Sequence, residues 1–338
     1  MLWNSTGGED LQGNSSDSGP ENVEQILVPI FDTVILVLGV GGHTMVIMIL
    51  CRRRRRGLGC MAQSPQGSTT GSSTDVLLLA LSCADLLLLS ILPFHTAAVV
   101  MQQWSFGNFL CRLVSFMGSA CSSASAFTLA TLAVSRYLTV VEPTKAYRVL
   151  LPHRVSIGAV LLWVPACGLA APQLVFRSVG IPYRTPDGLT CFAFLSHQEQ
   201  LIYGLFHFLV AFLLPLVTTA VAYGGIYMFL CSSKHTRRAS QVARYQSKVT
   251  QTSALLVLAF TLCWLPSYGL MLALLAVQTS GATGTSPRYG PFSVFARIMA
   301  TSSTVANPIL YVLMSQKFRQ DILRLFRRGE FSVRQAAA

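Results

Sequence analysis

The sequence predicts an all-α membrane protein: a bundle of seven transmembrane helices, with a short cytosolic interfacial helix after the seventh. The 338 residues are 52% hydrophobic and only 11% charged, whereas soluble domains carry about 25% charged residues. The chain also has seven stretches of roughly the 20 apolar residues that a membrane-spanning helix needs. This composition excludes a soluble enzyme, a disordered chain, a collagen and a coiled coil. A transmembrane barrel would show weak alternating segments instead, and none is visible.

The apolar stretches place the seven helices in order. Six of them contain no charged residue, and the seventh is interrupted only by Arg297. The second helix is expected to begin near Val76 and to carry Asp85 inside the membrane. The stretches are Thr33–Cys51, Leu86–Cys111, Leu113–Val134, Val155–Phe176, Leu201–Ser233, Val249–Pro287 and Tyr289–Gln316.

The distribution of basic residues predicts the orientation. Most of the 25 lysines and arginines fall on one side of the membrane, in Arg52–Arg56, Arg136–Arg154, Lys234–Lys248 and the C-terminal tail. By the positive-inside rule this side is cytosolic, which places the N-terminus outside a plasma-membrane protein and the C-terminus inside. The net charge of +12 is then available to anionic lipid and to an acidic cytosolic partner, and nucleic acid is not expected.

Residues 1–25, ahead of the seven-helix domain at 26–315, are expected to form an extracellular tail. The tail is polar and acidic, and it lacks the basic start and apolar core of a cleaved signal peptide. It carries two N-glycosylation acceptors, Asn4 and Asn14.

Two cytosolic segments have unusual composition. The inner loop 52–74 joins the arginine run Arg52–Arg56 to a Ser/Gly/Thr-rich stretch, 63–74, that is typical of a flexible linker. The run is interpreted as an anchor for lipid headgroups, with partner docking as the alternative. Residues 316–328 alternate apolar and basic side chains at helical spacing, which predicts a basic amphipathic helix in the membrane interface, before a short tail at 329–338.

Asp85 marks a candidate functional site, because a charge inside the membrane is costly. Ser125, Ser303 and Asn307 can supply further oxygen atoms from other helices. Oxygen-only ligands suit a hard cation, so an allosteric Na⁺ is predicted here, with a protonated Asp85 in a hydrogen-bond network as the alternative. No other cofactor is expected, since the six histidines show no zinc-ligand spacing.

Three short motifs stand at the expected depths of the third, sixth and seventh helices. They are Ser135-Arg136-Tyr137, Cys263-Trp264-Leu265-Pro266 and Asn307-Pro308-Ile309-Leu310-Tyr311, and each of the last two contains a proline that kinks its helix. In this order the chain resembles the rhodopsin-like (class A) G-protein-coupled receptors over residues 26–328. Further matches are Asp85, Trp104-Ser105-Phe106-Gly107, Cys111, Trp163, Cys191, Pro215 and Tyr223.

The resemblance implies a heterotrimeric G protein as the cytosolic partner and an activation switch inside the bundle. Arg136 would stabilise the inactive state and then contact the G protein. Tyr223 and Tyr311 would swing inward in the active state. Ligand contact would be passed to an outward movement of the sixth helix by Pro215, Phe260, Trp264 and the kink at Pro266.

Two positions depart from the family pattern. Ser135 stands where the family has an acid beside the arginine, so the charge-assisted restraint on Arg136 is missing and raised basal activity or altered coupling is predicted. His43 stands where the family has asparagine in the first helix. A packed, neutral His43 is expected, with a pH sensor as the alternative.

Cys111 and Cys191 are the two cysteines on the outer, oxidising side, so we predict a disulfide from the third helix to the second outer loop. The other cysteines are expected to be free thiols. Because none follows Cys263, the family's palmitoyl anchor is absent from the tail, and arginine and phenylalanine contacts must hold the last helix.

The residues narrow the class of ligand. All four lysines are cytosolic, which excludes a retinal Schiff base, and Gly118 occupies the position where amine receptors carry an aspartate. A peptide is the remaining class of ligand, and we expect it to bind under a hairpin in the second outer loop. Arg297 is expected to bind a ligand carboxylate, and pairing within the protein, for example with Glu199, is the alternative.

Four further residues are candidates for the ligand pocket, and core packing is the alternative for each: His95, Gln173, His207 and Tyr268.

Among the peptide receptors, the chain most resembles the galanin, somatostatin and kisspeptin group, and this resemblance implies Gi/o coupling. A constitutively active receptor or a non-signalling partner of other receptors is the alternative function. A transporter is disfavoured because only Asp85 and Arg297 are charged deep in the helices, and no catalytic constellation is found.

Overall fold

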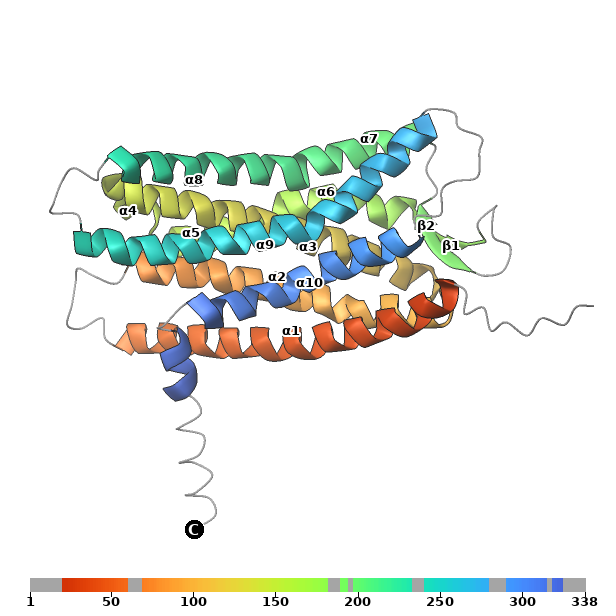
Figure 1. Ribbon diagram of the computed structural model, residues 1–338, viewed down its shortest axis with the longest axis horizontal. Coiled ribbons are helices and arrows are strands. Elements are labelled where there is room, and N and C mark those ends of the chain that lie inside the picture. The colour runs from red at the N-terminus through yellow and green to blue at the C-terminus, as the bar shows by residue number, and fades with distance from the viewer. Residues whose placement is uncertain are drawn as a thin grey trace, which may run out of the picture.

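The computed structural model describes residues 20–59, 69–181, 189–193, 197–232, 240–279, 290–314 and 318–324. Over these residues the protein is an elongated bundle of helices that run along one axis, with a small hairpin at one end (Figure 1). The predicted all-α membrane fold is confirmed.

The helices that make up each span are longer than the apolar stretch that predicts it, except in the last span, where Gly290–Met314 lies within its stretch. Their bounds in chain order are α1 (Pro20–Gly59), α2 (Thr69–Val100), α3 (Gly107–Val141), α4 (Pro143–Val149), α5 (Pro152–Leu161), α6 (Trp163–Phe176), α7 (His197–His207), η1 (Phe208–Leu213), α8 (Leu214–Ser232), α9 (Ser240–Thr279) and α10 (Gly290–Met314). A further helix follows at Phe318–Arg324 and is called the terminal helix below.

Six membrane spans qualify by length and hydropathy among the described residues, and Phe292–Leu313 qualifies as a seventh together with the terminal helix. α5 and α6 form one span, Pro152–Phe176, and α7, η1 and α8 form another, Gln198–Ser232. The π-helical turn η1 has a local cause. Pro215 lacks a backbone N–H and crowds the preceding turn, and the N–H of Leu214 bonds to the carbonyl of Leu209.

The start of α2 differs from the prediction. The helix begins at Thr69, well before Val76, so Thr69–Thr74 belong to a helix and not to the predicted flexible linker. Ser73 is buried, and its hydroxyl donates to the carbonyl of Leu150 across 2.5 Å. Tertiary contact outweighs the linker-like composition here. Residues 60–68, the middle of the predicted loop, lie outside the described residues, as do Asn4 and Asn14.

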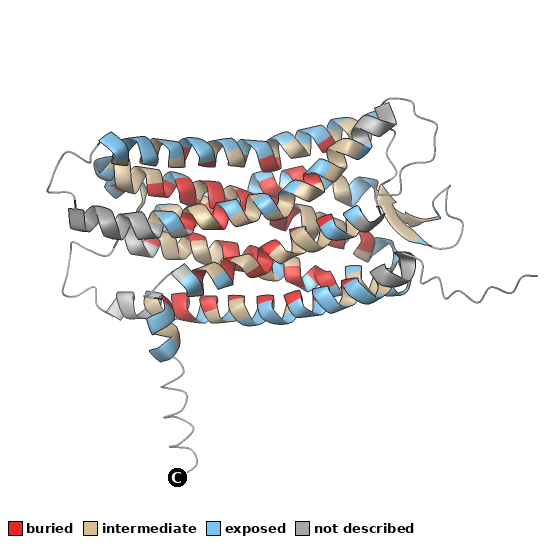
Figure 2. Ribbon diagram, viewed as in Figure 1, coloured by how far each residue is buried: buried red, intermediate tan, exposed pale blue. Residues whose placement is uncertain are grey.

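Buried residues line the inner faces of the helices, and exposed ones cover the outside (Figure 2). The largest core cluster joins α1, α2, α3, α9, α10 and the terminal helix through Leu50, Leu81, Leu129, Leu256, Tyr311 and Phe318. Large apolar side chains such as Val37, Val164 and Val221 face outward with about two-thirds of their surface exposed. In a bilayer these side chains contact lipid.

The second outer loop contains the predicted hairpin. β1 (Arg177–Gly180) and β2 (Thr190–Ala193) pair antiparallel, with Arg177 opposite Ala193 and Val179 opposite Cys191. The strands are short, and the hairpin lies over the end of the bundle that also holds the start of α3 (Figure 1).

Candidate functional site

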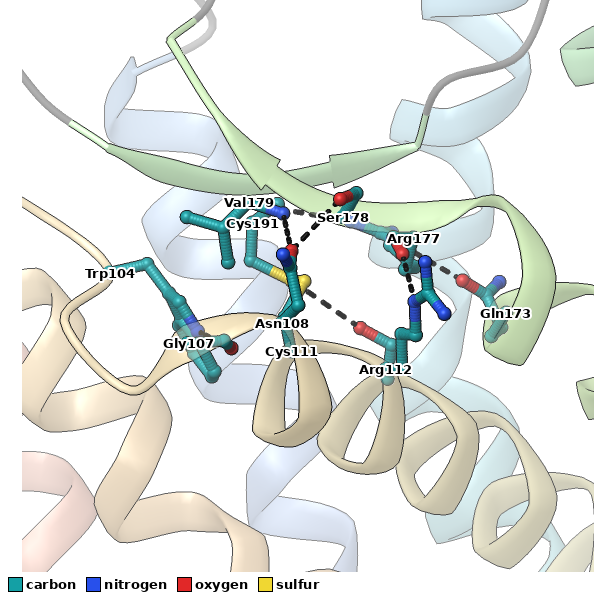
Figure 3. The surroundings of a disulfide bond; sticks show 11 residues. Trp104, Gly107, Asn108, Cys111, Arg112, Gln173, Arg177, Ser178, Val179 and Cys191 are labelled. Carbon is teal, nitrogen blue, oxygen red and sulfur yellow. Dashed lines mark hydrogen bonds between the residues drawn. A yellow bond between two sulfur atoms is a disulfide. The ribbon is translucent and has the colours of Figure 1, made fainter.

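The hairpin is fixed to α3 by a disulfide and by polar bonds (Figure 3). Cys111 and Cys191 are joined, which confirms the predicted disulfide. The amide oxygen of Asn108 accepts from the hydroxyl of Ser178 at 2.8 Å and from the backbone N–H of Val179 at 2.6 Å. Together these contacts hold β1 and β2 above the helical bundle.

A cavity of about 500 Å³ lies beneath the hairpin. Its walls come from α2, the turn after α2, α3, α6, the hairpin and α10, and they include His95, Gln173 and Arg297 of the predicted pocket residues. Sequence reasoning did not assign Arg177 or Gln103 to the pocket, although both line it. A basic residue directly after the fourth apolar stretch is the signal that would have identified Arg177.

His207 and Tyr268, the other two predicted pocket residues, are not among the residues that line this cavity within the described part of the chain. Nε2 of His207 is 3.0 Å from the hydroxyl of Ser119. The ring of Tyr268 is buried, stacks on His207 with 6.2 Å between centroids and contacts Phe212 at 4.5 Å. His207 and Tyr268 form part of an aromatic layer, which also includes Phe212 and Trp264.

Arg297 is paired inside the protein, but its partner is Asp32 and not Glu199. Nη2 of Arg297 lies 2.6 Å from Oδ2 of Asp32, which also accepts from the hydroxyl of Thr96 at 2.5 Å. The Asp32 side chain is only 2% exposed. The expectation that Asp85 and Arg297 are the only charges deep in the helices is therefore wrong.

Asp32 was missed because the first apolar stretch was defined by the absence of charge. That criterion starts the stretch at Thr33, the next residue, although α1 begins at Pro20 and continues through both. An acid flanked on both sides by apolar residues was the available signal.

The predicted ion-site residues converge in part. Both carboxylate oxygens of Asp85 accept hydrogen bonds: Oδ1 from Ser125 at 3.1 Å and Oδ2 from the amide of Asn307 at 2.6 Å. Asp85 is 3% exposed. Ser303 is bonded elsewhere, since it accepts from the indole of Trp264 at 3.1 Å and donates to its own helix.

His43 reaches the same cluster from α1. It is fully buried, its Nε2 is 3.5 Å from Oδ2 of Asp85, and it lies 2.7 Å from the carbonyl of Thr304. A carbonyl only accepts, so Nε2 carries a proton. Among the described residues Nδ1 has no hydrogen-bond partner, and a charged imidazole would bury a second N–H there. The geometry favours the packed, neutral histidine.

The aromatic layer continues along α9, away from the hairpin. Trp264 lies 6.1 Å from Tyr268 and 5.8 Å from Phe260, measured between ring centroids. Phe260 and Pro215 line one small gap between α3, α8 and α9. Pro266 lies inside α9 beside this row. Phe260 and Trp264, two of the predicted switch residues of the sixth helix, are therefore in contact, and Phe260 lies beside Pro215 of the fifth span.

Arg136 is buried near the opposite end of the bundle from the hairpin. Its exposed fraction is 8%, and its Nε donates to the hydroxyl of Ser253 on α9 at 3.3 Å. The hydroxyl of Ser135 donates its single proton to the carbonyl of Leu132 at 2.7 Å. Tyr137 packs tightly against α8, where a Cβ on Gly225 would approach its ring to 2.6 Å. Arg136 thus connects α3 to α9, and α3 is also packed on α8.

The terminal helix is held by arginine and phenylalanine contacts, as predicted. Phe318 is buried, with its ring 6.2 Å from that of Tyr311. The guanidinium of Arg53 lies 5.9 Å above the Phe318 ring, 2.8 Å from Asp321 and 3.5 Å from Asp75. At least one arginine of the run at 52–56 therefore binds protein side chains, and not only lipid headgroups.

Comparison with known proteins identifies similar sequences across nearly the whole chain. Residues 61–311 match the model of the 7 transmembrane receptor (rhodopsin family). The chain is 28% identical to somatostatin receptor type 5 of Rattus norvegicus, over 97% of this chain and 86% of that one. It is 29% identical to galanin receptor type 3 of Mus musculus (95% and 83%) and 27% identical to the KiSS-1 receptor of Mus musculus (92% and 78%).

Proposed function

The chain belongs to the rhodopsin family of seven-transmembrane receptors, and from this premise we propose that it binds an extracellular peptide and activates heterotrimeric G proteins. The N-terminus would be extracellular and the C-terminus cytosolic. This orientation agrees with the positive-inside rule, and it places the cavity and the disulfide outside, in an oxidising compartment.

A row of contacts that starts at the cavity wall and follows α9 toward Ser253, the partner of Arg136, is the observation that carries this proposal. The row passes from Gln173, which lines the cavity, through Tyr203 and His207 to Tyr268, Trp264 and Phe260. A ligand above it can shift the packing of Tyr268 and Trp264, and the missing hydrogen bond at Pro266 lets α9 bend at that level. Bending would separate Ser253 from Arg136 and open the cytosolic end.

Two states of one helix bundle are sufficient for this mechanism. An outer ligand and an inner partner each stabilise the state that they bind better, and each raises the affinity for the other. In the closed state Arg136 is buried against Ser253. In the open state its guanidinium, with Tyr223 and Tyr311 moved inward, would be available to the G protein.

The cluster around Asp85 supports a monovalent cation, because a buried carboxylate lies beside the hydroxyl oxygen of Ser125. Asn307 donates its amide N–H to Asp85 here and would have to turn its amide oxygen toward a bound cation. Bound there, Na⁺ would supply a counter-charge to Asp85 and stabilise the closed state. Ser303 would act on this site only after releasing Trp264, to which it is bonded here.

Two finer features of coupling are also proposed. The resemblance to galanin, somatostatin and kisspeptin receptors supports Gi/o as the G-protein class. Raised basal activity is supported by the hydroxyl at position 135, which donates within its own helix and offers Arg136 no carboxylate.

The test is G-protein dissociation in cells that express the full chain, with Arg136→Ala beside wild type. Loss of dissociation in Arg136→Ala at equal surface expression is expected. Arg154→Ala is the control: this arginine is exposed on the expected cytosolic side and bonds only to the carbonyl of Arg148 among the described residues. Equal signals from Arg136→Ala and wild type would contradict the mechanism, and no signal from any variant would favour the non-signalling partner.

A further inference from the structure

The cavity beneath the hairpin is basic. Its lining contains two guanidinium groups, those of Arg177 and Arg297, together with His95, and among the described residues it contains no aspartate or glutamate. The rest of the polar lining is neutral, such as Gln103 and Ser115. A pocket of this composition attracts negative charge.

The two arginines differ in what neutralises them. Arg297 has its counter-ion in Asp32 at 2.6 Å, on the side away from the cavity lining, since Asp32 does not line the cavity. Arg177 makes hydrogen bonds only to neutral groups in the described part of the chain: Nε donates to the amide oxygen of Gln173 at 2.9 Å, and Nη1 donates to the carbonyl of Cys191 at 3.2 Å.

The Arg177 side chain is also held in place before any ligand arrives. The amide nitrogen of Gln173 donates to the hydroxyl of Tyr203 at 3.0 Å, and that hydroxyl donates to the carbonyl of Leu169 at 3.0 Å. This chain of bonds orients the amide oxygen of Gln173 toward Arg177. Figure 3 shows the hydrogen bond between these two side chains. The disulfide of Cys191 fixes the other acceptor.

Burial lowers the pKa of the Arg177 guanidinium, as expected for a charge that is partly removed from water. An arginine side chain nevertheless stays protonated, with five N–H donors. Two of these donors are used in the contacts above. The group therefore offers a fixed, half-buried positive charge and remaining donors at the wall of a cavity.

We propose that Arg177, and not the ion-paired Arg297, binds a carboxylate of the peptide ligand, so that the receptor selects ligands with an acidic group. This inference rests on the proposed ligand site and names the chemistry that the site requires. A planar guanidinium matches a carboxylate in a bidentate manner, and pre-orientation by Gln173 reduces the cost of ordering the side chain on binding. The carboxylate can be a peptide C-terminus or an aspartate or glutamate side chain.

Affinity selection with a random heptapeptide library tests the inference on the purified full-length receptor in lipid nanodiscs. The library has three arms. One arm ends in a free carboxylate and contains no acidic residue, the second ends in an amide and contains Asp or Glu, and the third carries no acid at all. Enrichment of the first or second arm over the third is expected, and it identifies the source of the carboxylate.

Arg177→Gln should abolish this preference, with about a tenfold or larger loss of enrichment, as is typical when one partner of a buried charged contact is removed. Arg177→Lys should keep a weaker preference, because the charge remains without the bidentate geometry. The control Arg154→Gln removes the same charge at the cytosolic end, and Asp32→Asn with Arg297→Gln removes the other arginine at constant net charge. Both controls should keep the preference.

Equal enrichment of the three arms by the wild-type receptor would overturn the inference, as would a preference that survives in Arg177→Gln. Loss of the preference in the Asp32/Arg297 double variant alone would assign the carboxylate to Arg297 and also overturn it. The selection is scored without a G protein. Failure of the proposed signalling function therefore leaves this result interpretable, and failure of the acid preference leaves the signalling proposal intact.

Discussion

A serine at position 135 changes what restrains its neighbour Arg136. The serine hydroxyl donates to Leu132 within α3, and Arg136 bonds to a neutral hydroxyl on α9. A carboxylate at position 135 would add a charge-assisted hydrogen bond, worth about 1.5–3 kcal/mol, to the closed state.

Ser135→Asp is therefore expected to lower basal G-protein dissociation by about tenfold, since each ~1.4 kcal/mol is a factor of ten in an equilibrium. Ser135→Asn is the matched control, because it has nearly the same shape without the charge. Basal signals are measured at equal surface expression. Equal signals from the Asp and Asn variants would show that charge at this position does not set the equilibrium.

The pair of Asp32 and Arg297 joins α1 to α10 at the cavity. Arg297→Gln leaves a carboxylate that is 2% exposed without its cation. Because the arginine is 25% exposed, the expected loss of stability lies between the ~1 kcal/mol of surface pairs and the ~3–5 kcal/mol of fully buried ones. Adding Asp32→Asn should restore much of it. The melting temperature of the purified receptor reports both effects, and a double variant as unstable as the single one would contradict the argument.

At the scale of residues, the sequence indicates which polar side chains lie inside the bundle better than it indicates what they bind. Local sequence was enough to select Arg297 as a candidate pocket residue, Asp85 as a candidate ion ligand, and Cys111 and Cys191 as a disulfide. The partner of Arg297 was not, because Asp32 lies 265 positions away, and their contact depends on the relative depth and rotation of two helices. Ser303 likewise had the right depth, but its hydroxyl faces Trp264.

At the scale of elements, α1 and α10 approach each other closely at Gly42. A Cβ at this position would lie 2.8 Å from two ring atoms of Pro308. The proline ring is rigid and belongs to a helix, so neither partner can give way cheaply. The glycine therefore sets the distance between α1 and the kink of α10.

Gly42→Ala is expected to lower stability by about 1–3 kcal/mol through overpacking, read as a fall in melting temperature. Gly41→Ala is the matched control on the preceding residue, where a Cβ would meet nothing within 4 Å. Any gain from helix propensity is the same at both positions, so the difference isolates the contact with Pro308. Two variants of equal stability would show that the helices separate without cost.

The lengths of the apolar stretches predicted that the helices exist, but they did not predict where the helices begin and end. α2 begins at Thr69 inside a Ser/Gly/Thr-rich segment, because contacts such as that of Ser73 with Leu150 order its first turns. The π-turn before Pro215 was likewise absent from the prediction, although the proline is its cause. The terminal helix was predicted from its periodicity. The use of arginine and phenylalanine to hold it was predicted from the lack of a cysteine after Cys263, but the identity of Arg53 was not predicted.

At the scale of the whole molecule, the two ends of the bundle have different chemistry. The end that is proposed to be the outer one carries the cavity, the hairpin and the disulfide, and the opposite end carries Arg136 and the contacts of Arg53. The aromatic row along α9 extends from the first end toward the second. The distribution of basic residues predicts which end is cytosolic, whereas the ligand cavity and the hairpin were expected from the resemblance to a receptor family.

The disulfide should therefore affect the outer end alone. It links α3 to β2 across 80 residues, but the spans between these cysteines are held by the bilayer and by helix packing, so the bundle does not depend on it for folding. The hairpin has two other attachments. Asn108 accepts from Ser178, and the backbone N–H of Trp104 donates to the carbonyl of Leu189. Removing the disulfide should loosen the hairpin without releasing it completely.

Cys111→Ala with Cys191→Ala is expected to speed hydrogen exchange of the strand amides at 177–180 and 190–193 by about tenfold or more, as local opening becomes easier. Exchange in the cytosolic half of α3, around Arg136, should stay as in wild type. Cys121→Ala is the control, since this cysteine is a buried free thiol in the same helix. The acid preference of the cavity should fall with the disulfide, because Cys191 supplies an acceptor that fixes Arg177. Faster exchange throughout α3 would instead show that the disulfide stabilises the bundle as a whole.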